Sequence, residues 1–223
     1  MGTKREILVE IYQRLLSAYG PQGWWPADTR FEVMVGAILT QATAWRNVER
    51  AIQRLKAAGA LSPERMARLS EGELAELIRP AGFFRQKTRR LRALLQLIGQ
   101  YGSVEGLLSL PAGELRRQLL SVPGVGPETA DSILLYAAGY PVFVVDAYTK
   151  RILHRLGLLS GEKAGYEEVQ ELFESNLPRD PKLYGEYHAL LVRHAKEHCR
   201  ARPRCPGCPL APVCNFFKGQ GSL

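Results

Sequence analysis

Four cysteines near the C-terminal end are the residues of this 223-residue chain with the clearest capacity for chemistry. The only cysteines present, they follow the pattern C-x5-C-x2-C-x5-C and are Cys199, Cys205, Cys208 and Cys214. Structural zinc sites usually combine two C-x2-C pairs, whereas one C-x2-C flanked by single cysteines is more typical of iron–sulfur ligation. The spacing therefore favours a [4Fe–4S] cluster over zinc. Disulfides are disfavoured because the N-terminal residues do not resemble a secretory signal.

Basic side chains gather around this cysteine segment. Six of them lie within it or beside it, namely Arg193, Lys196, Arg200, Arg202, Arg204 and Lys218. The whole chain carries 30 Lys and Arg against 22 Asp and Glu, a net charge of +8. Such a surplus favours a nucleic acid or an anionic membrane as partner, although it also serves solubility alone. No run approaches the ~18 apolar residues of a transmembrane helix. The cysteines and the basic residues around them predict a surface that is organised by a metal centre and contacts a polyanion.

Residues 122–131, VPGVGPETAD, form a glycine-rich turn that opens a helix. Gly124 and Gly126 allow positive φ angles and a close approach of the backbone to another group. Pro127 suits the first position of the new helix, and the backbone N–H groups there can bind an anion. Together with a helix over 113–121 the turn predicts a helix–hairpin–helix. Taken alone, the same letters also suit an ordinary turn between helices.

Asp146 follows the apolar run Val142–Val145 and stands where the next helix should begin. The commonest use of such an aspartate is to cap the helix N-terminus. A carboxylate at a helix start beside apolar walls is also a plausible catalytic group. Asp146 is therefore the candidate catalytic residue.

The elements that must position these groups are helices. Apolar residues at three- to four-residue spacing predict helices over 5–19, 31–39, 47–57, 73–79, 86–101, 113–121, 127–138, 146–156, 165–176 and 183–198. Breaks rich in Gly and Pro separate them. The one β-like run, Val142–Val145, is too short to found a sheet. The sequence predicts an all-α protein with short connections.

In this order, the features resemble the helix–hairpin–helix–Gly/Pro–Asp superfamily of DNA glycosylases, the endonuclease III group. The matching motifs are VPGVGPETAD, the aspartate of FVVD, the C-terminal cysteines, LTQAT around Gln41 and GFFRQK around Phe83. The resemblance covers nearly the whole chain. It implies a [4Fe–4S] cluster as cofactor and double-stranded DNA with damaged bases as partner. It also implies that Asp146 stabilises the oxocarbenium-like sugar and orients or deprotonates water.

The same resemblance implies two helical domains with the active-site cleft between them. One is a helical barrel of residues 27–135 that holds the hairpin. The other joins residues 1–26 to residues 136–223 and carries the cluster, whose role is structural. The implied DNA-binding residues are Gln41, Phe83, Gly124, Val125, Gly126 and Thr129. Gln41 and Phe83 match loops that fill the gap left by a flipped base and wedge the opposite strand, or they are plain surface or packing residues.

One position of the hairpin distinguishes two branches of the superfamily. Bifunctional members carry a lysine two residues after the second glycine, where this chain has Glu128. A carboxylate cannot form the imine that β-elimination requires. Lys150, one helical turn after Asp146, is the nearest substitute and equally suits an exposed helix position. The resemblance therefore implies a monofunctional glycosylase without AP lyase activity.

The N-terminal segment narrows the expected substrate. Residues 24–45, WWPADTRFEVMVGAILTQATAW, and residues 79–87, RPAGFFRQK, resemble the endonuclease III-like 3-methyladenine DNA glycosylases. In that branch the residues that match Trp24, Trp25, Pro26 and Trp45 line the pocket for the flipped base. The alternative is that they are core aromatics. Because alkylation at N3 or N7 makes a purine cationic, the base would stack favourably on indole faces.

The expected function is thus excision of alkylated purines such as 3-methyladenine in base excision repair. One alternative is a glycosylase for mismatched thymine or uracil, or for oxidised pyrimidines, with AP lyase activity. An alternative of another class is a non-catalytic or redox-sensing DNA-binding protein, which would not need Asp146. We expect a cytoplasmic, nucleoid-associated monomer. The sequence does not determine the lesion range or the opposite-base preference.

Overall fold

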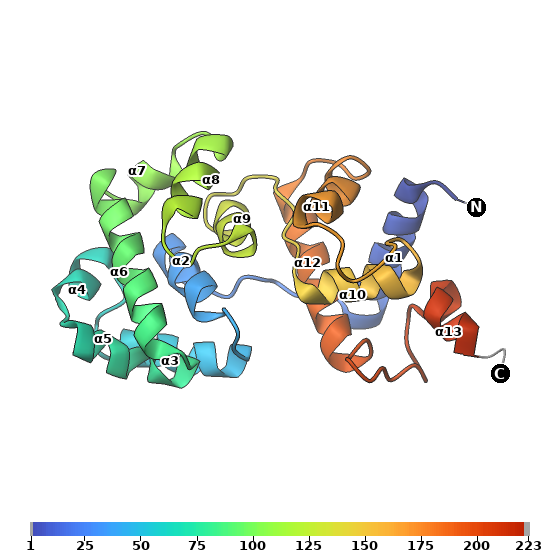
Figure 1. Ribbon diagram of the computed structural model, residues 1–223, viewed down its shortest axis with the longest axis horizontal. Coiled ribbons are helices and arrows are strands. Elements are labelled where there is room, and N and C mark those ends of the chain that lie inside the picture. The colour runs from blue at the N-terminus through green and yellow to red at the C-terminus, as the bar shows by residue number, and fades with distance from the viewer. Residues whose placement is uncertain (1, 221–223) are drawn as a thin grey trace. The chain divides into compact units, whose positions relative to one another are not determined.

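A computed structural model describes residues 2–220 of the chain, and every regular element in that range is a helix (Figure 1). No strand forms within residues 2–220, which confirms the predicted all-α fold. The β-like run Val142–Val145 belongs to the connection that leads into Asp146. Among the described helices, none combines the length and apolarity needed to cross a membrane.

The chain divides into two compact units. One unit comprises Trp25–Tyr140, and the other combines the segment up to Trp24 with the segment from Pro141. The expected boundaries, at residues 26–27 and 135–136, differ from this division by a few residues. The hairpin belongs to the first of these units, and Asp146 and the cysteines belong to the second.

The unit of residues 25–140 is built around one buried helix. Its helices are α2 (Arg30–Leu39), α3 (Trp45–Ala57), α4 (Pro63–Arg68), α5 (Glu71–Ile78), η1 (Arg79–Ala81), α6 (Phe84–Gln100), α7 (Val104–Leu108), α8 (Ala112–Ser121) and α9 (Pro127–Tyr136). Helix α2 begins where the Thr29 hydroxyl accepts a hydrogen bond from the Glu32 amide. Every residue from Phe31 to Leu39 is buried, and the helix packs against α3, α6 and α9. An all-round apolar helix requires such a central position.

The other unit is centred on a long helix with an aromatic core. Its helices are α1 (Lys4–Tyr19), α10 (Ala147–Leu156), α11 (Tyr166–Glu174), α12 (Pro181–Glu197), η2 (Ala211–Val213) and α13 (Asn215–Gln220). Helix α12 packs against α1 and α10. Phe143 stacks on Phe173 with ring centroids 3.7 Å apart, and Tyr187 meets both rings edge-on. This core fixes the segment that immediately precedes Asp146.

Candidate active-site residues and nucleic-acid interface

Asp146 is the N-cap of α10. Its Oδ1 accepts hydrogen bonds from the amide and the hydroxyl of Thr149, at 2.7 and 2.9 Å. Its Oδ2 lies 3.7 Å from Nε2 of His188, and its side chain is 11% exposed. Burial alone would raise the pKa of Asp146, but the nearby His188 and the bonds from Thr149 outweigh burial and lower it. The carboxylate is therefore ionised at neutral pH.

His188 is a site residue that the sequence did not reveal. The four histidines of the chain carry no metal-site pattern. The structure places His188 on α12, buried, with its imidazole beside the carboxylate of Asp146. Because that neighbour arises from the packing of α10 on α12, no local pattern could have indicated it.

The hairpin joins α8 to α9 through a tight turn. Gly124 has a φ of +80°, and a Cβ built there would collide with the side chain of Arg90. The Val125 amide donates to the Val122 carbonyl at 3.0 Å, and the Val125 side chain is buried. Positive φ was expected at both Gly124 and Gly126, but Gly126 has a φ of −100°. A Cβ on Gly126 would meet no atom within 4 Å, so the expectation of positive φ was wrong there.

Gln41 lies against the hairpin. Its Nε2 donates to the Gly124 carbonyl at 3.0 Å and to the Thr129 hydroxyl at 2.9 Å. Its Oε1 accepts a hydrogen bond from Arg90, a residue of α6 that sequence analysis missed. Thr129 is buried, so its hydroxyl holds Gln41 rather than facing outward. The structure thus joins three sequence-predicted DNA-binding residues through one amide.

Phe83 precedes α6 in a conformation that a phenylalanine rarely adopts. Its backbone is left-handed, with φ 45° and ψ 31°, and its side chain is 63% exposed. The next residue, Phe84, turns partly inward, and Arg79 lies over its ring at 5.7 Å. A large exposed aromatic on a strained backbone is typical of a binding residue.

Three of the four expected pocket residues line one cavity. Trp25, Pro26 and Trp45 border a cavity of about 150 Å³ within the unit of residues 25–140. The rings of Trp25 and Trp45 meet edge-on, with centroids 5.4 Å apart. Gly36 of α2 forms part of the wall beneath the indole of Trp25. Trp24 belongs to the other unit, at the end of its N-terminal segment.

Charged groups complete the same cavity. Glu32 is buried in its wall, and its Oε1 lies 2.8 Å from Nζ of Lys56. Lys56 also meets Asp28, at 2.7 Å, and these carboxylates raise the pKa of its ammonium. The cavity therefore combines indole surfaces with the carboxylates of Glu32 and Glu49 and with the ammonium of Lys56.

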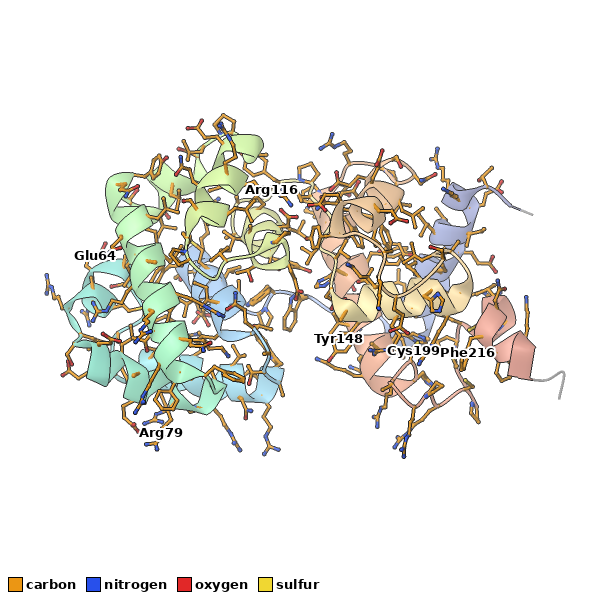
Figure 2. All side chains as sticks on the ribbon, in the orientation of Figure 1. Glu64, Arg79, Arg116, Tyr148, Cys199 and Phe216 are labelled. Atoms are coloured by element: carbon orange, nitrogen blue, oxygen red, sulfur yellow. The ribbon has the colours of Figure 1, made fainter. Side chains whose placement is uncertain are left out.

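The four cysteines come together at the end of α10. None of the four forms a disulfide, all are half-buried, and they line one cavity of about 30 Å³. Arg155 of α10 donates to Sγ of Cys199 at 3.4 Å and covers the ring of Phe216 at 5.1 Å. Figure 2 shows Cys199 and Phe216 beside this end of α10. The six basic residues named around the cysteines are all exposed.

The donor set, four thiolates, fits a multi-iron cluster. In a [4Fe–4S] cluster each thiolate binds a different iron atom, so four cysteines complete the ligand set. The four sulfur atoms share one cavity whose walls include Ile152, Leu156 and Leu210. An apolar shell of this kind suits a closed site with four thiolates.

Two residues bear on the lyase question. Glu128 lies in the first turn of α9, at the position where bifunctional members carry the lysine. Lys150 lies on α10, where its Nζ donates to the Ala164 carbonyl at 2.7 Å. The ammonium of Lys150 is thus engaged by the connection between α10 and α11.

Two helical units, a glycine hairpin and a helix capped by an aspartate are the architecture of a class of base excision DNA repair proteins. The family model of the HhH-GPD superfamily, described as base excision DNA repair proteins, matches residues 35–179. This range contains both the hairpin and Asp146. The chain belongs to the HhH-GPD superfamily.

Relatives and solved structures agree with this assignment. A protein of Methanocaldococcus jannaschii, provisionally named a DNA repair glycosylase, is 51% identical over 95% of this chain and 97% of its own length. A thymine-DNA glycosylase of Aeropyrum pernix is 30% identical over 97% of this chain and 95% of its own length.

Two solved structures are similar. The 3-methyladenine DNA glycosylase of H. pylori bound to 1,N6-ethenoadenine has a TM-score of 0.74 and 31% identity over 87% of this chain and 97% of that one. An endonuclease III in a non-covalent DNA complex has a TM-score of 0.83 over the full length of both chains, at 24% identity. The second likeness shows the shared fold alone.

Proposed function

We propose that the protein is a monofunctional DNA N-glycosylase that excises alkylated purines such as 3-methyladenine from double-stranded DNA. The observation that carries this proposal is the cavity bordered by Trp25, Pro26 and Trp45. A 31% identical relative was solved as a 3-methyladenine glycosylase with a modified adenine bound. Three of the four residues of this chain that match that branch, Trp25, Pro26 and Trp45, line the cavity.

The cavity selects its base by charge. An alkylated purine carries a positive charge, and a cation over an indole face gains ~0.5–2 kcal/mol, depending on desolvation. The weakened glycosidic bond of such a base needs no strong general acid. Glu32 and Glu49 add negative charge to the wall, and Lys56, which also pairs with Asp28, offsets part of it. The indoles of Trp25 and Trp45 add their own preference for a cation.

Asp146 supplies the catalytic charge. Its Oδ1 is held by Thr149 at the start of α10, which fixes the carboxylate without consuming Oδ2. As the base departs, positive charge develops on the sugar, and an ionised carboxylate stabilises it. The same group orients or deprotonates the attacking water. The His188 imidazole keeps the carboxylate in its ionised form.

The vacated position in the duplex must be filled while the base is outside it. Flipping costs a few kcal/mol, less for a damaged and poorly stacked base. Gln41 and the exposed ring of Phe83 fill the gap and wedge the opposite strand. Gly124, Val125, Gly126 and Thr129 form or support the turn that approaches the DNA backbone.

The proposal that the protein lacks lyase activity rests on two side chains, those of Glu128 and Lys150. Glu128 cannot form an imine, and the ammonium of Lys150 is bonded to the Ala164 carbonyl. Borohydride should therefore trap no covalent adduct with a damaged duplex. Stoichiometric trapping that disappears in Lys150→Ala would assign a lyase function to that lysine.

A [4Fe–4S] cluster would be held by Cys199, Cys205, Cys208 and Cys214. When bound it would supply no step of the reaction, because four thiolates leave no open iron position, and its loop would present basic side chains to DNA. Elemental analysis should find about four iron atoms per chain. About one zinc and no iron would overturn this assignment.

A second candidate substrate is thymine in a mismatch. The full-length similarity to a thymine-DNA glycosylase favours it. A panel of duplexes, each with one defined lesion, separates the candidates when base release is scored with and without alkali. Release of 3-methyladenine and 7-methylguanine, with strand cleavage only after alkali, is the expected result. Efficient release of mismatched thymine, uracil or thymine glycol with poor release of methylated purines would refute the alkylpurine assignment.

A further inference from the structure

Lys87 is a buried charge that neither the hairpin nor the base cavity explains. It lies in the first turns of α6, is 1% exposed and is among the largest fully buried side chains. A lysine is rarely buried this completely unless it is paired. The partners of its ammonium are two backbone carbonyls, those of Leu39 at 2.8 Å and Ala81 at 2.7 Å. Moving an ammonium from water to a buried site with only neutral partners is unfavourable, so the burial of Lys87 needs an explanation.

The two carbonyls occupy equivalent places in two different loops. Leu39 is the last residue of α2, and Ala81 is the last residue of η1. Carbonyls at helix ends lack intrahelical partners and carry partial negative charge, so an ammonium suits them. Gln41 stands two residues after the first carbonyl, and Phe83 stands two residues after the second. One side chain thus anchors both loops immediately before their gap-filling residues.

Each of the two loops contains one residue with a strained backbone, close to its anchored carbonyl. Within residues 2–220, only Ala42 and Phe83 among non-glycine residues have positive φ, at 50° and 45°. Such backbone conformations are disfavoured and persist only where the surroundings fix them. Ala42 is next to Gln41, and Phe83 is itself the second gap-filling residue. The anchored carbonyls lie three residues and two residues before these strained positions.

We propose that Lys87 is a positioning residue that sets the Gln41 and Phe83 loops together, so that both side chains enter the gap left by a flipped base. The proposal rests on the proposed role of Gln41 and Phe83 in filling that gap. The backbone of Lys87 belongs to the Phe83 loop, because its amide donates to the Phe83 carbonyl at 3.0 Å, and its side chain reaches the Gln41 loop through the Leu39 carbonyl. A single ammonium therefore coordinates two insertions that flipping needs at the same time.

The test removes the ammonium of Lys87 and keeps the apolar part of its side chain. Lys87→Met retains length and apolar packing but removes both hydrogen bonds. The matched control is Arg92→Met, because Arg92 also lies on α6 and also donates to two carbonyls, those of Ala67 and Leu69. Those carbonyls belong to the end of α4 and lie outside both gap-filling loops. A purely structural loss would appear in both variants.

The readout is independent of the lesion that the enzyme prefers. A duplex with a tetrahydrofuran abasic analogue, and 2-aminopurine opposite it, reports insertion into the gap by its fluorescence. Wild type and Arg92→Met should give the same change, and Lys87→Met should weaken the insertion equilibrium about fivefold, which corresponds to roughly 1 kcal/mol. In the Lys87→Met background, Gln41→Ala should cause little further loss.

Three results would overturn the proposal. They are an unchanged signal in folded Lys87→Met, an equal loss in Arg92→Met, and full additivity of Lys87→Met with Gln41→Ala. If Lys87→Met does not fold, Lys87→Gln replaces it, because the amide can still donate to one carbonyl and should give a smaller loss. A protein that inserts normally yet releases no methylated purine would refute the proposed substrate and leave the role of Lys87 intact.

Discussion

Gly36→Ala probes the base cavity without removing any aromatic side chain. Gly36 lies within α2, and an added Cβ would lie 3.0 Å from Cζ2 and 3.2 Å from Nε1 of Trp25. These separations are tight, so the indole must give by a few tenths of an ångström. Because Trp25 is only half-buried, it can shift. The substitution therefore moves one wall of the proposed pocket.

The expected effects on stability and activity differ in size. Alanine in place of glycine in a helix gains about 1 kcal/mol, and the contact with Trp25 offsets part of that gain. Stability should therefore stay within roughly 1 kcal/mol of wild type. A cation–π contact of ~0.5–2 kcal/mol corresponds to about 2- to 30-fold in rate, so a partly displaced indole should lower excision several-fold.

The assay is single-turnover excision of 3-methyladenine and 7-methylguanine, together with thermal unfolding. Gly99→Ala is the control, because Gly99 also lies in a helix and its added Cβ would meet no atom within 4 Å. The control should excise at the wild-type rate. Wild-type excision by folded Gly36→Ala would show that Trp25 does not line the base pocket, and the reasoning from the cavity would fail.

Three further predictions concern the catalytic carboxylate, the hairpin and the buried lysine. Asp146→Asn should bind abasic DNA normally yet lose about 10²-fold in excision, since it removes charge while preserving shape; a fully active variant would refute its catalytic role. Gly124→Ala should weaken abasic-DNA binding and cost about 1–2 kcal/mol, while Gly126→Ala should leave the stability unchanged, as binding titrations and melts would test. Burial and then Arg90 lower the pKa of Lys87 to about 8, and the groups that face its Nζ from α2 and η1 are carbonyls. The unfolded chain binds the extra proton above pH 8, so stability should rise between pH 8 and 10.5. Melts of both proteins should show that the stability of wild type relative to Lys87→Met rises over this range.

The long helices could be predicted because their apolar residues repeat at helical spacing over several turns. Helices α4, α7 and α13 were missed, since five or six residues contain too little of that repeat to be recognised. Helices α4 and α7 are fixed by other means. The Ser62 hydroxyl caps α4 and the Ser103 hydroxyl caps α7, and tertiary contacts hold α4 and α7 against α6.

The candidate residues that stand in a local pattern could be proposed from the sequence. Asp146 follows an apolar run and precedes a helix, and the cysteines stand at ligand-like spacing. Their partners were not found, because His188, Arg90 and Lys87 reach the site through helix packing between distant segments. Gly126 shows the opposite error, since a glycine in a motif was credited with a positive φ that only Gly124 adopts.

The central claim is that the cavity recognises a cationic base through Trp25. Its most direct measurement compares the affinity for two uncleavable duplexes, both with a 2′-fluoro-arabinose sugar opposite the same partner base. One carries 7-methylguanine, which is cationic, and the other carries guanine, which is neutral. Wild type should bind the cationic duplex about 2- to 30-fold more tightly, and Trp25→Ala should reduce that preference. Equal affinity in wild type, or a preference that Trp25→Ala leaves unchanged, would contradict the claim.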